Sequence, residues 1–215
     1  MRFYGPLKRR DQYEARPEDG SFYEYAHYRS AIAEDCKYRC VYCDCHEDCI
    51  GGREAMEMDH FRPWNKKFGV LKEKKFEHLV NQPTNLVHAC GVCNGFKWVH
   101  WPTEDPALEY DQEKGWVDPF KECRGDFLQV QGDGTLVDRK PPAKYQIKKL
   151  RLNRPLLKRL REYQIVVDNV ERTQKPKWQS IIKEQPGSAH AKTATFALHL
   201  LAAFQTFLNV TSVED

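Results

Sequence analysis

Two pairs of cysteines with metal-ligand spacing are the most informative feature of this sequence. Each pair has the spacing C-x-x-C, and 46 residues separate the first pair from the second: Cys40 and Cys43, then Cys90 and Cys93. Two such pairs are typical of one tetrahedral zinc site, in which the metal ties two distant segments together. A structural zinc of this kind contributes on the order of 10 kcal/mol to folding. The four thiolates are therefore predicted to bind structural Zn²⁺, the alternative being reduced cysteines in a protein core.

Further potential ligands crowd the first cysteine pair. Because they lie within a few residues of it, the spacing leaves open a swapped ligand or a second metal ion: Cys36, Cys45, His46 and Cys49.

Side chains able to serve a divalent metal ion and a water molecule lie between and beside the cysteine pairs: Asp59, His60, Asn85 and Asn94. A neutral histidine such as His60 can take a proton from a water molecule. The oxygens of Asp59 and Asn94 suit Mg²⁺ or Mn²⁺, which can act as a Lewis acid. Singly, each residue has an ordinary explanation as a turn carboxylate, a core histidine, a turn amide or a helix cap. Their joint order around the cysteines favours a site.

The complete pattern is C-x2-C, then D-H-x-x-P, then N-L-x3-C-x-x-C-N-x-x-K, and it resembles the HNH endonucleases in their zinc-bearing form. The resemblance covers residues 36–100. It implies that His60 is the general base, that Asp59 and Asn94 hold the catalytic ion, and that Asn85 orients a loop. Asn94 stands where many members have histidine. Lys97, and Arg62 less strongly, are candidates for phosphate contacts, with a solvated charge as the alternative reading.

The predicted fold class is α+β: a zinc-bound ββα-metal (HNH, treble-clef-like) module with an N-terminal helix and a mainly α-helical C-terminal extension. Strands are expected at 55–61 and 85–89 and a helix at 91–98. Neighbouring strand residues point to opposite faces, so Asp59 and His60 share a site only at an irregular strand end, which Pro63 favours. The expected organisation is an arm and helix (1–35), the nuclease module (36–100), a linker with a small β-hairpin (101–142) and a helical region (143–215).

Local sequence patterns also predict the secondary structure on either side of the nuclease module. The arm 1–20 is expected to be loosely ordered, and a Ser21–Glu24 capping box predicts a helix from 22 to 35 with a core-facing stripe of Tyr25, Tyr28 and Ile32. In the C-terminal region Asn153 is expected to cap a helix that ends near 174, and further helices follow at 176–185 and 188–209.

Charge is unevenly distributed although the net charge is only +3. Residues 144–161 carry eight Lys and Arg side chains and no Asp or Glu, a local charge of +8. This tract predicts an amphipathic helix laid on DNA phosphates, the alternative being a solvated helix face. The residues selected as DNA contacts are Lys148, Lys149, Arg151 and Lys158.

The last predicted helix, 188–209, is apolar nearly all round. Burial within its own domain is slightly favoured, and docking of a second copy (a homo-oligomer) or of another protein is the alternative. The chain has neither an apolar signal segment nor an apolar run long enough for a bilayer, so a cytoplasmic protein without a membrane partner is expected.

The leading functional hypothesis is a metal-dependent DNA endonuclease. The alternatives are a non-catalytic zinc module that binds DNA and an assembly subunit that is active only with a partner. Two further segments, Trp116–Pro119 and Leu150–Arg154, resemble the nuclease subunits of Septu-type bacterial antiphage systems. That resemblance implies an antiviral role and an ABC-type ATPase partner.

Overall fold

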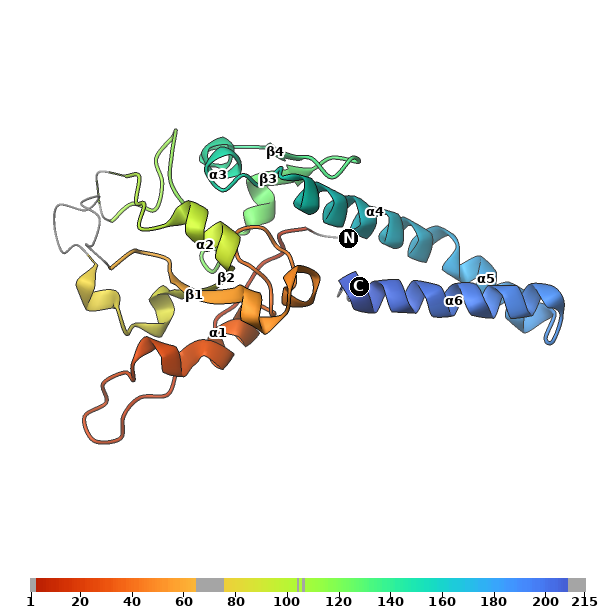
Figure 1. The fold of residues 1–215 in the computed structure, drawn as a ribbon, viewed down its shortest axis with the longest axis horizontal. Coiled ribbons are helices and arrows are strands. Elements are labelled where there is room, and N and C mark those ends of the chain that lie inside the picture. The colour runs from red at the N-terminus through yellow and green to blue at the C-terminus, as the bar shows by residue number, and fades with distance from the viewer. Residues whose placement is uncertain (1–2, 65–75, 104, 106, 209–215) are drawn as a thin grey trace. The chain divides into compact units, whose positions relative to one another are not determined.

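The computed structural model describes residues 3–64, 76–103, 105 and 107–208. It combines helices with two small antiparallel sheets, so the expected α+β class is confirmed (Figure 1). The chain divides into two compact units. The larger unit holds Arg2–Val130 and Leu136–Arg154, and the smaller, helical unit holds Gln131–Thr135 and Pro155–Asp215. Among the described residues, no helix combines the length and the apolar character needed to cross a bilayer.

The centre of the larger unit is a two-stranded sheet followed directly by a helix (Figure 1). Strand β1 (Met56–His60) pairs antiparallel with β2 (Leu86–Cys90), in a register that sets Met56 opposite Cys90 and His60 opposite Leu86. Helix α2 (Gly91–Lys97) begins at the next residue, because the Cys90 thiol caps it by accepting the Cys93 N–H. The two strands and the helix predicted in this segment are confirmed. Between the two strands, residues 65–75 lie outside the described residues.

The N-terminal helix is shorter than its sequence predicted. A 3₁₀ turn, η1 (Tyr25–Tyr28), leads into α1 (Arg29–Asp35), and Ser21 makes no cap. The Tyr23 N–H bonds instead to the Tyr28 hydroxyl, which itself donates to the Glu14 carbonyl, so a tertiary contact outweighs the capping signal. In the predicted stripe, Tyr28 and Ile32 are buried, but Tyr25 is exposed.

The expectation of a loosely ordered N-terminal arm is wrong. Tyr4 is fully buried, and its N–H bonds to the Asp44 carboxylate. The Arg9 guanidinium donates to the carbonyls of Pro83 and Leu86 at 3.1 Å each, beside the start of β2. The arm therefore packs against the segments that form the sheet.

The segment read as a linker contributes to the larger unit. Its predicted hairpin is confirmed, with β3 (Leu128–Val130) pairing antiparallel with β4 (Leu136–Asp138). Trp116 and Phe127 are buried core residues. The short 3₁₀ helices in this unit are η2 (Glu47–Ile50), η3 (Arg53–Ala55), η4 (Glu77–Leu79), η5 (Pro83–Asn85) and η6 (Arg124–Asp126).

The basic tract does not form one helix, contrary to expectation. Helix α3 (Ala143–Lys149) ends before buried Leu150 and Leu152, and α4 (Pro155–Thr173) starts only after Arg154. The Asn153 amide bonds both to the N–H and to the C=O of Leu136, so it holds the start of β4. Helices α5 (Lys175–Glu184) and α6 (Ala189–Leu208) follow, close to their predicted bounds.

Candidate metal centre and adjoining pocket

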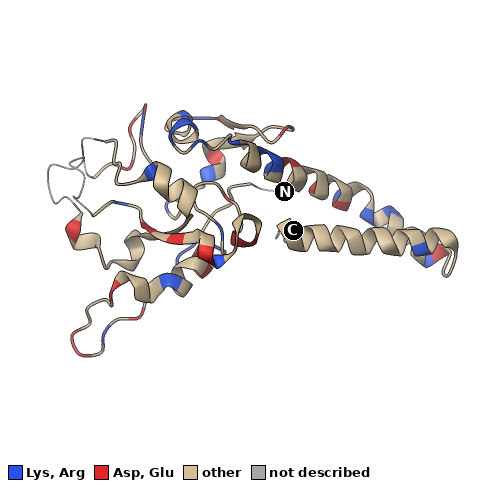
Figure 2. Cartoon of the chain, in the orientation of Figure 1, with Lys and Arg blue, Asp and Glu red and all other residues tan. Residues whose placement is uncertain are grey.

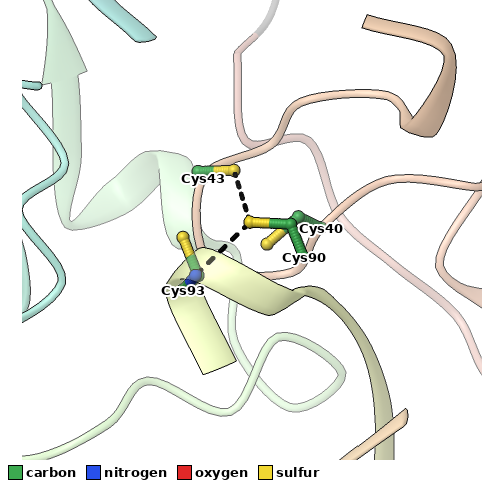
Figure 3. Close-up of side chains that lie close together, drawn as sticks. All are labelled: Cys40, Cys43, Cys90 and Cys93. Carbon is green, nitrogen blue, oxygen red and sulfur yellow. Dashed lines mark hydrogen bonds between the residues drawn. The ribbon is translucent and has the colours of Figure 1, made fainter. Parts of the chain in front are cut away.

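The four predicted cysteines converge on one point (Figure 3). Their sulfur atoms all lie within 4.8 Å of one another, and all four residues are buried. In a tetrahedral zinc–thiolate site the Zn–S bonds of about 2.3 Å place the sulfur atoms roughly 3.8 Å apart. The four cysteines can therefore hold one metal ion such as zinc with little movement.

Backbone contacts explain how two distant segments meet at this centre. The Val41 N–H bonds to the His88 carbonyl of β2 at 2.9 Å, and the Asp44 N–H closes the first turn onto the Cys40 carbonyl at 2.8 Å. On the other side, the Cys93 N–H lies 3.4 Å from the Cys90 sulfur. Each C-x-x-C pair is thus held in a tight turn, one beside β2 and one at the start of α2.

The ionisation of each thiol depends on its three neighbours. Burial raises the pKa of the Cys40 thiol well above its ordinary value. Hydrogen bonds from the neighbouring thiols, first of all from Cys40, lower the pKa of Cys90. A single thiolate is thus stable among its neighbours, whereas four buried thiolates repel one another unless a metal ion neutralises them.

The additional potential ligands do not form a second centre. Within the described residues, the four cysteines are the only group of His, Cys, Asp and Glu side chains placed to share a metal ion. The Cys36 sulfur instead accepts the His88 N–H, and burial raises the pKa of Cys36 to about 12. The His88 ring lies 3.1 Å from the Glu47 carboxylate.

Arg154, a residue of the basic tract, contacts the cysteine centre. The Arg154 guanidinium lies 3.4 Å from the Cys93 sulfur and 3.9 Å from the Cys90 sulfur. Burial opposes its charge, but the thiolates, Cys93 first, raise the pKa of Arg154. Its positive charge offsets part of the double negative charge that four thiolates leave on a bound Zn²⁺.

We expect Arg154→Ala to lower zinc affinity about tenfold, as the loss of an outer-shell partner does at other metal sites. Competition with a chromophoric chelator measures this directly. Arg151→Ala is the matched control, because Arg151 lies over the Phe96 ring and makes no contact with a cysteine. Equal zinc affinity in the Arg154 variant and the wild type would show that the contact has no effect on the metal.

A pocket of about 350 Å³ lies beside the cysteine centre, where the end of β1 meets α2. Three of the four candidate catalytic side chains line it together: Asp59, His60 and Asn94. Asp59 and His60 are neighbours in β1 and pair in regular register with Val87 and Leu86, yet both line the pocket. The irregular strand end that the sequence analysis expected is therefore not seen at these two residues. The structure nevertheless brings these three residues together, as the sequence predicted.

His60 is held in one orientation. Its Nε2 atom lies 2.8 Å from the Val80 carbonyl oxygen, which can only accept. The neutral ring therefore carries its proton on Nε2, and Nδ1 is left as the acceptor nitrogen. Edge-on contacts with Tyr25 and Trp64, at centroid distances of 5.0 and 5.8 Å, fix the ring plane. Burial lowers the pKa of His60, so the neutral form prevails near pH 7.

Asp59 has two partners that the sequence did not reveal. The Lys97 ammonium, with a side chain that is 0% exposed, lies 2.9 Å from Oδ2 and 3.1 Å from Oδ1. The Tyr42 hydroxyl donates to Oδ2 as well. Lys97 also donates to the His60 carbonyl at 3.0 Å. Lys97 thus positions the β1 end, and its burial excludes the predicted phosphate contact in this structure.

Asn94 and Glu57 supply further oxygen atoms to the same pocket. The Asn94 Nδ2 donates to the Glu57 carboxylate, which leaves the Asn94 carbonyl oxygen as an acceptor. A carboxylate oxygen has two lone pairs, so Asp59 Oδ1 retains capacity beside Lys97. The donor set of Asp59, Asn94 and Glu57 is therefore chemically suited to a hard divalent cation.

Asn85 bonds to the loop that follows β1. Its Oδ1 accepts the Arg62 N–H at 2.9 Å and its Nδ2 donates to the Arg62 carbonyl at 3.0 Å. The Arg62 guanidinium pairs with Glu109 at 2.7 Å and lies over the Trp101 ring. Arg62 is thus engaged within the protein, and the predicted phosphate contact is not available to it in this arrangement.

Sequence reasoning missed four residues of the pocket region. Two of them carried a signal: Glu57 lies two residues before Asp59 on the same strand, and Trp98 follows the N-x-x-K motif. Trp98 is 52% exposed and lines the pocket rim. The contacts of Tyr42 and Val80 come from tertiary packing and leave no local pattern.

Compared with protein-family models, with curated proteins and with solved structures, the chain matches none.

Proposed function

We propose that this protein is a metal-dependent endonuclease of the HNH type, with structural zinc at the four cysteines. One observation carries the proposal. A neutral histidine with a fixed ring and an acceptor nitrogen lines the same pocket as the oxygens of Asp59 and Asn94. The motif order and the strand–strand–helix arrangement around the cysteines support the family assignment.

The residues of the chain divide the chemistry among them. The Nδ1 atom of His60 takes a proton from the attacking water, and the Nε2–H bond to Val80 stabilises the ring when it becomes charged. Asp59 and Asn94, with Glu57 beside them, would hold Mg²⁺ or Mn²⁺. Such an ion supplies charge stabilisation for the phosphate and for the leaving oxygen. Asn85 keeps the loop after β1 in place.

The metal role of the pocket can be tested through Asn94. We expect Asn94→Ala to raise the Mn²⁺ concentration needed for half-maximal cleavage, with partial recovery in excess Mn²⁺, because one oxygen ligand is removed. Asn94→Asp is the control, since it keeps an oxygen at that position. An unchanged Mn²⁺ dependence in the alanine variant would remove Asn94 from the ion site.

A test of the role of Asp59 needs two substitutions at once, because Asp59 is paired with buried Lys97. Removing Asp59 alone leaves the Lys97 ammonium buried without its partner, a change that costs about 3–5 kcal/mol of stability. The double variant Asp59→Ala with Lys97→Met avoids this cost. It should remain folded, judged by thermal melting, and still lose metal-dependent cleavage.

The buried ion pair also supports a second candidate. A lysine that already neutralises Asp59 suits a zinc module that binds nucleic acid without cutting it. In that case Asn94→Ala and His60→Ala would bind nucleic acid as the wild type does, and none of the three would cleave it.

DNA is the proposed substrate, and the exposed part of the basic tract is the proposed contact. Lys148 and Arg151 are exposed, whereas Arg161 is buried and donates to the Gly134 carbonyl at 2.7 Å. Lys158 pairs with Asp133 at 3.0 Å, which lessens its value as a phosphate contact.

We expect the triple variant Lys148→Ala, Lys149→Ala and Arg151→Ala to bind duplex DNA more weakly and with a shallower salt dependence. Counterion release predicts a slope change of about 0.9 for each phosphate that the variant no longer neutralises. Fluorescence anisotropy over a salt series measures it, with Lys158→Ala as the control that changes little. If the salt dependence of DNA affinity is unchanged in the triple variant, these three side chains do not contact the DNA phosphates.

The proposed biological setting is antiphage defence with an ABC-type ATPase as partner. It rests on the resemblance of Trp116–Pro119 and Leu150–Arg154 to Septu-type nuclease subunits. Trp116, Leu150 and Leu152 are buried in the larger unit, so these residues of the two segments contribute to its core. Copurification from the native host tests for the ATPase.

A further inference from the structure

The helical unit exposes a continuous row of large apolar side chains on α6. Phe196, Leu200, Phe204 and Phe207 follow one helical stripe and are 63, 47, 56 and 57% exposed. The buried side of α6 is a different one, which packs against α4 and α5 and is formed by Ala191, Ala194, Leu201 and Leu208. The slightly favoured expectation that this stripe is buried within its own domain is therefore wrong.

Helix α4 extends the apolar surface. Tyr163 and Val166 are 54 and 55% exposed. Between them and the α6 stripe lies a groove of about 580 Å³, to which Val170, Trp178 and Ala197 also contribute. The surface thus combines projecting aromatic rings with an adjacent hollow, and we call it the α4–α6 face.

The size of the α4–α6 face suits a protein interface. With about 200 Å² for each aromatic side chain, the exposed parts of its six large residues amount to roughly 600 Å². That value reaches the upper end of apolar patches on monomers, and it approaches the ~800 Å² that each partner contributes to a standard interface.

The charge pattern of α6 favours a partner like itself. Lys192 is the one Asp, Glu, Lys or Arg residue in Ala189–Leu208, and α6 is correspondingly almost free of charged colour in Figure 2. A helix that lies on a membrane surface usually carries several Lys or Arg on its polar face, and α6 does not. A strongly charged partner would find no opposite charge along α6, whereas the α6 helices of two copies can meet without charge repulsion.

We propose that the α4–α6 face is a homodimer interface. A two-fold interface uses the same patch on both copies, so that patch must offer both projecting groups and the hollow that receives them. The α4–α6 face offers both, through the phenylalanines of α6 and the groove beside Leu200 and Phe204. Dimerisation buries the apolar stripe of both copies at once.

Light scattering coupled to size-exclusion chromatography of the full-length protein tests the proposal, without nucleic acid or added metal. The wild type should run as a dimer. The double variant Leu200→Ser with Phe204→Ser should dissociate at least about 100-fold more readily, since each substitution acts on both copies. The monomeric double variant should melt at the same temperature as wild type that has been diluted until it is monomeric. Both substituted side chains are already half exposed in the monomer, so their loss should cost the monomer little stability.

Two control variants separate the interface from the core. Thr195→Ala with Thr206→Ala changes exposed positions on another face of α6 and should leave the dimer intact. Leu201→Ser removes a buried contact and should lower the melting temperature. A monomeric wild type, a double variant that stays dimeric, or wild type that sediments with neutral phospholipid vesicles would each overturn the proposal. The outcome is independent of nuclease activity.

Discussion

His60→Ala is expected to lower nucleic-acid cleavage by roughly 10² to 10⁴-fold, the usual contribution of a general base. The variant loses the acceptor nitrogen of the pocket, but it keeps Asp59, Asn94 and the four cysteines. Zinc content and nucleic-acid affinity should therefore stay close to those of wild type. Loss of the hydrogen bond to the Val80 carbonyl should lower the free energy of unfolding by about 1 kcal/mol. Thermal melting should show this as a small decrease in melting temperature.

His78→Ala is the matched control for this experiment, because His78 is an exposed histidine of η4. It should cleave at the wild-type rate. A His60 variant with wild-type turnover would remove the base from the proposed mechanism. If both histidine variants lost activity together, a general loss of folding would be the explanation instead.

Cys90→Ser is expected to have the largest effect on stability. Cys90 is one of the four converging cysteines, ends β2 and caps α2. One substitution therefore acts both on the proposed zinc site and on the junction of strand and helix. Since structural zinc contributes on the order of 10 kcal/mol in small zinc peptides, its loss exceeds the stability of most domains. We expect bound zinc to fall close to zero and the cooperative melting of the larger unit to disappear.

Cys49→Ser is the control, since Cys49 lies near the first pair but outside the converging four. It should keep one zinc per chain and the wild-type melting temperature. Metal analysis and differential scanning calorimetry compare the two variants. Wild-type zinc content and melting in Cys90→Ser would mean that the ligand set is wrong.

The strand–strand–helix core and the four-cysteine cluster were predictable because their signals lie in short sequence motifs. Cys90 and Cys93 indicate both a thiolate pair and a helix start. The D-H-x-x-P and N-L motifs lie where β1 ends and β2 begins. The hairpin of β3 and β4 could likewise be predicted from its Gly-Asp-Gly turn.

The contacts that the sequence did not predict come from tertiary packing. Arg154 reaches a sulfur 61 residues earlier in the chain, and a single arginine in a basic tract carries no sign of that partner. Lys97 fits the HNH pattern, yet its burial against Asp59 depends on how α2 packs on β1. The Ser21–Glu24 pattern predicts a helix start that the Tyr23–Tyr28 contact overrides.

Cleavage of closed circular plasmid and of single-stranded DNA by zinc-loaded wild-type protein is the most direct test of the central claim. We predict products in Mg²⁺ or Mn²⁺, none after chelation of these ions, and recovery when they are restored. Because a short chelation step also strips weakly held zinc, zinc content is measured in the same samples. Absence of products with the zinc-loaded protein, or products that neither chelation nor His60→Ala reduces, would contradict the proposed nuclease function.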